Sequence, residues 1–394
     1  MPTSTQTTTT TRSGLKVKTH VKAGPALTIN HNETLVRPAG ARFWSFTLWW
    51  LCAGVVLASA SAAGAAQLTC PTATTLETLV ACIVDYMPRK KTNGPDGYWP
   101  PSPQQLADYR TVVNQMLHRQ CDATLPRSLA ANLQRRMFTD SQNGKSYCLL
   151  METELATTGK VAKGWGTFIV ADRADREISH QAPHPIADSK TDKQAIGLFK
   201  STNARSFLMC GAHREANGTT GSCQDDAQKQ KYNGAADCAH NRDNMFTMAN
   251  LELDAFYRAS PWTAIQWHGM GTDKCLGVDV YMSQGINDAP ANFSTLSMLK
   301  QLITVDQPWA VHDPGDLSPT GTHVCDRPGT DNVQGRLLNG MPDSTVCDLD
   351  MDATASVGDK FIHIEQKDDC PSTNPSITSC RDAAAWSQAV LDTW

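Results

Sequence analysis

The sequence of 394 residues lacks several features that would assign it to a common class of protein. It has no internal repeat, no Cys-x-x-Cys pair and no cysteine–histidine spacing of a zinc knuckle, so structural zinc is the weaker interpretation of its thirteen cysteines. It also lacks a serine-hydrolase elbow, because Tyr281 stands where the motif around Ser283 requires glycine. Beyond residue 66 there is no basic stripe. There, 29 lysines and arginines stand against 38 acidic residues, and this net charge of −9 argues against a nucleic-acid partner.

Residues 1–66 have the composition of a tail followed by an export signal. Residues 1–42 are threonine-rich and basic and cannot form a core, so we expect a disordered tail. Residues 43–66 pass from an apolar run, Phe43–Leu57, to Ala-x-Ala sites that end near Ala66, as in a cleaved signal peptide. An uncleaved signal anchor is the alternative. In that case residues 43–59 would be the chain's membrane contact, with the C-terminal domain outside. The sequence therefore predicts a secreted, extracellular or periplasmic protein.

The cysteines agree with export. Cys52 lies in the apolar segment, and the other twelve are spread between Cys70 and Cys380. An even number of cysteines in an exported chain predicts several disulfides, although their pairing cannot be read from the sequence. We expect the mature protein to have few free thiols.

The exported part divides into two regions by its hydrophobic pattern. Residues 67–147 form a helical N-terminal region, because apolar residues recur at helical spacing over 76–84 and 106–116, on either side of a Pro/Gly-rich loop. Residues 148–394 alternate short apolar runs with amphipathic stretches, which predicts an α/β domain with a mixed sheet flanked by helices. Strands are expected near 167–171, 206–210, 263–268, 277–281, 309–312 and 361–365, and helices near 191–202, 244–258, 293–303 and 381–392.

Metal-ligating residue types stand in a turn between a predicted strand and a predicted helix. The turn, Pro183–Thr191, contains His184 and Asp188, and Ser189 with Asp192 has the spacing of a helix-capping box. Imidazole and carboxylate are two ligands that a catalytic zinc takes from protein. The alternative interpretation is a turn histidine beside a helix-capping aspartate.

Two later strands supply the remaining chemistry. His268 ends the short apolar strand 264–267 and precedes glycine, so a ligand can approach it at the rim of the sheet. Alternation over 361–365 places His363 and Glu365 on one face of a strand that is otherwise apolar. A glutamate in such a strand needs a function or a partner. The order of these residues along the chain predicts three metal ligands, His184, Asp188 and His268, and a separate base, Glu365.

These motifs resemble those of the zinc carboxypeptidase-like amidohydrolases. The resemblance is to the branch that contains phage poly-gamma-glutamate hydrolases, with N-formylglutamate amidohydrolases as more distant relatives. It rests on the Pro183-His184 turn, on Asp188 and Thr191 after it, on His268-Gly269 and on the late Glu365. Two departures stand out: Pro-Ile-Ala replaces a Gly-rich turn, and the acidic ligand is Asp rather than Glu. The resemblance implies Zn²⁺ as cofactor and a secreted hydrolase that cleaves a peptide-like or gamma-glutamyl-like amide, with Glu365 as general base.

Other polar residues are candidates for the substrate, which we expect to be a small peptide or an amino-acid amide. An arginine in such a cleft would bind a carboxylate through two parallel hydrogen bonds. The candidates are Arg214, Arg242, Arg336 and His363, whereas His180 is a rival metal ligand and His312 and His323 are interpreted as structural or surface residues. A hypothesis from another class is a catalytically inactive, disulfide-rich extracellular binding or surface protein on the same fold.

Overall fold

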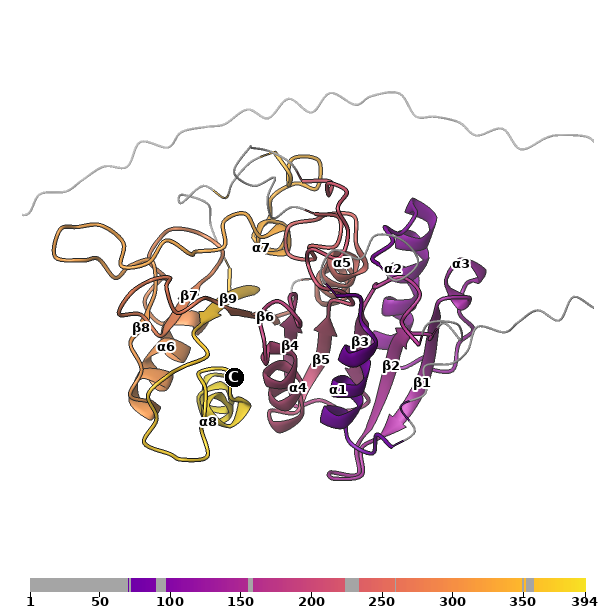
Figure 1. Ribbon diagram of the computed structural model, residues 1–394, viewed down its shortest axis with the longest axis horizontal. Helices are drawn as coiled ribbons and strands as arrows, with labels where there is room; N and C mark the ends of the chain where they lie inside the picture. Colours follow the sequence, from indigo (N-terminus) through magenta and orange to yellow (C-terminus); the bar gives the residue numbers. More distant parts are fainter. Residues whose placement is uncertain are drawn as a thin grey trace, which may run out of the picture. The chain divides into compact units, whose positions relative to one another are not determined.

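The computed structural model describes residues 70, 72–89, 97–154, 159–223, 234–258, 260–348, 351 and 358–394 (Figure 1). The predicted tail, 1–42, and the predicted export signal, 43–66, lie outside these residues. In the described part, no helix has the length and apolar character needed to cross a bilayer.

A mixed sheet of nine strands forms the centre of the domain, which confirms the predicted α/β class (Figure 1). The strand order is β1-β2-β3-β5-β4-β6-β9-β7-β8. Strands β5, β4, β6 and β9 are parallel neighbours, and β1, β2, β3 and β5 pair antiparallel. The bounds are β1 Leu133–Thr139, β2 Ser146–Glu152, β3 Thr167–Ala171, β4 Arg176–Ala182, β5 Ala204–Met209, β6 Thr263–Gly269, β7 Val280–Ser283, β8 Val311–His312 and β9 Phe361–Gln366.

Helices cover both faces of this sheet, because its strands bury alternate side chains on opposite sides. In β2, for example, Leu149 and Met151 pack into one core and Leu150 into the other. The first core is closed by α1 (Leu76–Tyr86), α4 (Thr191–Ser201), α6 (Thr295–Asp306) and α8 (Ala383–Thr393). The second is closed by α2 (Pro103–Leu117), α3 (Arg127–Ala130), α5 (Met245–Tyr257) and α7 (Val333–Leu338) (Figure 1).

The N-terminal region is partly different from the prediction. Helices α1 and α2 are confirmed, but residues 133–139, expected to be helical, form strand β1. Arg135 and Arg136 lie on this strand. The predicted boundary at residue 147 falls inside β2, which pairs with β1 on one side and β3 on the other. The α1 and α2 helices are accordingly part of the layers that cover the sheet.

Six disulfides confirm that the cysteines beyond residue 66 are paired, as expected of a chain that folds in an oxidising, extracellular environment. Four of them tie loops of the second half of the domain, and two tie the N-terminal part. The pairs are Cys70–Cys82, Cys121–Cys148, Cys210–Cys238, Cys223–Cys347, Cys275–Cys325 and Cys370–Cys380.

Candidate metal centre

Three parallel strands end at the same edge of the sheet, and each brings one element of the site there. His184 lies two residues after the end of β4, and His268 and Glu365 lie near the ends of β6 and β9. His268 and Glu365 are direct partners in the parallel ladder between β6 and β9. Ligand sites in α/β sheets form outside the carboxyl ends of the strands, which is where these side chains converge.

The turn after β4 places Asp188 beside His184. The amide of Asp188 donates to the carbonyl of His184 at 2.8 Å, which closes one turn of chain between the two residues. The hydroxyl of Thr191 donates to the carbonyl of Asp188 at 2.7 Å, so the start of α4 holds the turn from the other side. Both imidazole and carboxylate are buried.

The predicted capping box at the start of α4 is wrong. The residue at the N-cap is Lys190, in the left-handed conformation with φ of 70°, and its side chain makes no capping hydrogen bond. The Ser189 hydroxyl accepts a hydrogen bond from Arg381 instead, and Asp192 lies inside the first turn of the helix. The local spacing predicts a cap, but in the structure the Ser189 hydroxyl is bonded to Arg381, 192 residues away in sequence.

His184, Asp188 and His268 come together as a buried group of three donor atoms within 4.8 Å of one another. The Oδ2 atom of Asp188 lies 3.2 Å from Nδ1 of His184 and 3.4 Å from Nδ1 of His268. Burial by itself would raise the pKa of Asp188, but the two histidines outweigh it and lower the pKa well below its usual range. The carboxylate is therefore charged and available to a cation.

The outer nitrogen of each histidine has its own partner. Nε2 of His184 lies 2.9 Å from Oδ1 of Asp237, and Nε2 of His268 lies 3.3 Å from Oε1 of Gln266. With a cation beside Asp188, both Nδ1 atoms would bind it through their lone pairs, and a proton on each Nε2 would satisfy the outer acceptors. Metal-ligating histidines are commonly held in this way by a second hydrogen bond. The sequence analysis did not identify Asp237 or Gln266.

His240 stacks on this centre and adds a positive charge. Its ring centroid lies 6.1 Å from that of His184, with an angle of 24° between the planes. Nδ1 lies 3.0 Å from Oδ1 of Asp237, and Nε2 lies 3.6 Å from Oδ1 of Asp331. Burial opposes the charged ring, but the two carboxylates outweigh it and raise the pKa of His240 to about 10.

Glu365 lines the cavity that also contains His184, Asp188 and His268. One of its oxygens, Oε2, is buried and has no hydrogen-bond partner in the described part of the chain. Burial and the nearby Asp188 carboxylate raise the pKa of Glu365 to about 7, with Arg327, His184 and Arg214 acting in the opposite direction. A carboxyl group with a pKa near 7 is suited to proton transfer at neutral pH.

His363 lies close to both Glu365 and His268. Its Nε2 is 3.8 Å from Oε1 of Glu365, and its ring centroid is 4.5 Å from that of His268. Burial lowers the pKa of His363 well below its usual value, so the ring is neutral. Gly329 packs on the ring: a Cβ there would lie 2.9 Å from the His363 Cγ, so a side chain at this position would push the loop and the ring apart.

A cavity of about 480 Å³ joins these groups. Arg214, one of the predicted carboxylate binders, lines it, and its Nη1 lies 3.4 Å from Nδ1 of His184. Lys274 and Arg327 also line it, from loops between the strands, and the sequence analysis missed both. Positive side chains and the three candidate ligands thus share one space.

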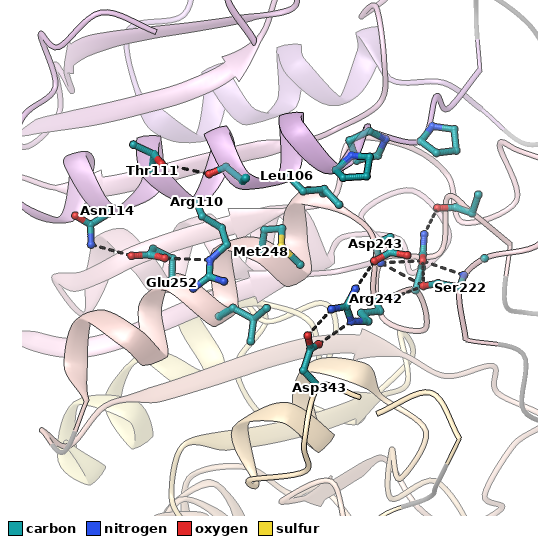
Figure 2. A pocket seen from close by; sticks show the side chains of 18 of the residues that line it. Leu106, Arg110, Thr111, Asn114, Ser222, Arg242, Asp243, Met248, Glu252 and Asp343 are labelled. Atoms are coloured by element: carbon teal, nitrogen blue, oxygen red, sulfur yellow. Dashed lines mark hydrogen bonds and ion pairs between the residues drawn. The ribbon is translucent and has the colours of Figure 1, made fainter. Parts of the chain in front are cut away.

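Arg242 and Arg336 do not line this cavity. Arg242 faces a separate groove of about 1220 Å³ beside α2 and α5, where its guanidinium pairs with Asp243 and Asp343 (Figure 2). Arg336 is buried and donates to the carbonyls of Thr330 and Val346, each at 2.8 Å, so it holds two loops together. The structure gives these two predicted substrate ligands other partners.

The rival ligand His180 lies in the core. Its Nε2 is 3.2 Å from the Thr202 hydroxyl, and its Nδ1 accepts from Nε1 of Trp267 at 3.2 Å. Burial lowers the pKa of His180 to about 3, so it is a neutral, satisfied core histidine. His312 and His323 lie outside the residues that line the cavity, as the structural interpretation expected.

Comparison with known proteins does not assign a family to this chain. No family model matches the chain, and no curated protein matches its sequence. Three solved structures are similar at 10% identity: gene product Atu2144 from Agrobacterium tumefaciens (TM-score 0.31, covering 56% of this chain and 92% of that one), a candidate metallopeptidase from Shewanella amazonensis SB2B (0.28, 74% and 91%) and carboxypeptidase A from Helicoverpa armigera (0.30, 75% and 71%). At this level of similarity, the assignment of function depends on the geometry of the site.

Proposed function

We propose that this chain is a secreted, zinc-dependent hydrolase that cleaves an amide bond. The observation that carries the proposal is the group of His184, Asp188 and His268 with the unpartnered carboxyl oxygen of Glu365 in the same cavity. The predicted export signal, which ends near Ala66, and the six disulfides support secretion.

The residues fit a catalytic zinc by the nature of their donor atoms. Two imidazole nitrogens and one carboxylate oxygen form a three-ligand set that leaves a further position open for water or substrate. Because the outer nitrogens are engaged by Asp237 and Gln266, the ring orientations are fixed before any ion binds. A zinc held here would polarise the scissile carbonyl and lower the pKa of water at the site.

The chain's own side chains then have separate roles in hydrolysis. Glu365 accepts a proton from the attacking water and donates it to the leaving amine, for which a pKa of about 7 is appropriate. The charged His240, held by Asp237 and Asp331, contributes positive charge to the cavity wall where the carbonyl oxygen becomes negative.

The positive side chains in the cavity favour a substrate that carries a carboxylate. Arg214, Lys274 and Arg327 line the same space as the candidate ligands. A peptide-like or gamma-glutamyl-like amide has both the scissile bond and the carboxylate that this arrangement needs. The resemblance to zinc carboxypeptidase-like amidohydrolases supports the same substrate class.

Replacement of Glu365 tests the enzymatic part of the proposal. Glu365→Gln keeps the size of the side chain but cannot accept a proton, so we expect turnover to fall by about 10²–10⁴-fold with zinc content unchanged. The assay is release of free amine from a panel of acylated dipeptides and gamma-glutamyl amides. The matched control is Glu252→Gln, which loses an ion pair with Arg110 outside the cavity and should keep its turnover. Unchanged turnover in Glu365→Gln, with a lowered melting temperature, would show a purely structural glutamate.

A further inference from the structure

Arg381 is a buried arginine that lies between the disulfide-bonded Cys380 and helix α8, 16 residues after Glu365. Its guanidinium contacts three separate chain segments. Nε and Nη2 donate to the carbonyl of Gln366 at 3.2 and 2.9 Å, and Nη2 also donates to the carbonyl of Met270 at 3.2 Å. Nη1 donates to the carbonyl and the hydroxyl of Ser189 at 2.9 and 3.2 Å.

Each of these acceptors lies one or two residues after a functional side chain. Ser189 follows Asp188, Met270 comes two residues after His268, and Gln366 follows Glu365. One side chain therefore contacts the segments that carry the acidic metal ligand, the second histidine ligand and the proposed base. Arg381 itself is not among the residues that line the cavity, so it acts through these segments and not on substrate.

The shape of arginine explains why it occupies this position. The Gln366 carbonyl also accepts from the amide of Met270 at 2.9 Å, so the guanidinium adds donors at the point where the end of β9 meets the segment after β6. A planar guanidinium presents five N–H donors in fixed directions and can satisfy several carbonyls at once, whereas a lysine ammonium is a compact charge that cannot hold three segments in one plane.

Gly269 gives an independent indication that this packing is tight. A Cβ at Gly269 would lie 2.5 Å from both Cζ and Nη2 of Arg381. The glycine directly after His268 is therefore required by the guanidinium that passes against it. In the sequence alone, the same glycine indicates only room for a ligand's approach.

Other contacts join the same segments around Arg381. Gln194 of α4 and Gln366 of β9 exchange amide hydrogen bonds of 2.8 and 2.9 Å. Lys190 pairs with Asp368 at 2.7 Å across the same two segments. The turn that carries Asp188 is thus fixed to the end of β9 at several points, with Arg381 in contact with both.

We propose that Arg381 is a positioning residue that sets the spacing of Asp188, His268 and Glu365. The proposal rests on the proposed function, because that spacing matters for zinc. Loss of the guanidinium removes the one side chain that contacts all three segments and leaves every ligand present.

The test compares zinc affinity and backbone protection in three single variants of the full secreted chain and in the double variant that combines Arg381→Met with Gly269→Ala. Arg381→Met removes the guanidinium and keeps an apolar stem, and Gly269→Ala forces the guanidinium out of its place. Arg205→Met is the matched control, because Arg205 pairs with Glu177 near the amino-terminal ends of β5 and β4, at the opposite edge of the sheet. Zinc affinity is measured by competition with a chromogenic chelator, and amide hydrogen exchange is measured on the metal-free proteins.

Arg381→Met and Gly269→Ala should each lower zinc affinity by about tenfold or more, in the range that residues around metal ligands usually show. In the double variant, Gly269→Ala should add less than about twofold, because the two changes remove the same contact. Arg205→Met should lower the melting temperature and leave zinc affinity unchanged.

Hydrogen exchange separates failure of this proposal from failure of the proposed function. In metal-free Arg381→Met, amides near Ser189, Met270 and Gln366 should exchange faster than in the wild type, whereas Arg205→Met should leave them protected. If the wild type binds no zinc, the proposed function is wrong, and the exchange data still decide whether Arg381 joins the three segments. Wild-type zinc affinity and wild-type protection in Arg381→Met would overturn the positioning role.

Discussion

Replacement of Asp237 tests whether the orientation of His184 contributes to zinc binding, because His184 itself remains in the variant. The Oδ1 atom of Asp237 is the acceptor for Nε2 of His184 and lies 3.0 Å from Nδ1 of His240, and the side chain is fully buried. Asp237→Asn keeps the shape and removes the charge. The imidazole of His184 then loses the carboxylate that fixes its tautomer and raises the basicity of Nδ1.

The expected magnitude follows from these contacts. Loss of a partner of a metal-bound histidine typically lowers metal affinity by about 10–100-fold, which corresponds to about 1.4–2.7 kcal/mol. His240 loses the carboxylate that contributes most to its raised pKa, so its ring should titrate at lower pH. All three ligands of the proposed zinc remain in Asp237→Asn, so a loss of affinity measures their orientation.

The assay is a zinc titration in competition with a chelator of known affinity, with the titration of His240 followed by NMR. Asp331→Asn is the matched control, because Asp331 contacts His240 at 3.6 Å and is not a partner of His184. It should lower the pKa of His240 and change zinc affinity little. If Asp237→Asn binds zinc as tightly as the wild type does, the carboxylate does not orient His184 and the proposed arrangement of the metal ligands is wrong.

Two further predictions concern buried groups away from the cavity. Burial raises the pKa of Glu152 to about 7, against hydrogen bonds from backbone amides of residues 163–166, whereas the unfolded group titrates near 4.5. The folded state therefore binds this proton more tightly, and the resulting stability, up to about 3 kcal/mol, is complete below pH 4.5 and lost as the pH rises through about 7. Denaturant unfolding at pH 5 and pH 8 should show a smaller difference for Glu152→Gln than for the wild type; an equal difference would contradict the shift. His180→Ala should lower the melting temperature, because the ring bridges Thr202 and Trp267, and zinc analysis should still find a full equivalent; loss of the metal would make His180 a ligand.

The sequence predicts the elements whose side chains follow a simple apolar pattern. Strands β3, β5, β6 and β9 are apolar runs buried on both faces, and their positions agree with the prediction within two residues. The middle of β4 carries Ser179, His180 and Gln181, all buried and polar, so its sequence gives no apolar signal. These groups are satisfied in the core by long-range hydrogen bonds, such as that between Gln181 and Asn250.

The same distinction applies to the site. That His184, Asp188, His268 and Glu365 lie around one cavity could be predicted, because each stands at a recognisable place relative to a strand or turn. Asp237 could not, because its contact with His184 spans 53 residues and has no local signature. The contact of Arg381 with Ser189 spans 192 residues, and a lone arginine before a helix is indistinguishable in sequence from a surface residue.

The zinc content of His268→Ala, measured beside that of the wild type, tests the central claim most directly. His268 is the proposed ligand from β6, and its removal leaves His184 and Asp188 as a pair of candidate donors. Atomic absorption on the purified secreted proteins should find one equivalent of zinc in the wild type and less than about a tenth of an equivalent in His268→Ala after dialysis. Circular dichroism should show that the variant is folded, since six disulfides and both cores are unchanged. A full equivalent of zinc in folded His268→Ala, or no zinc in the wild type after exposure to the metal, would contradict the proposed zinc site.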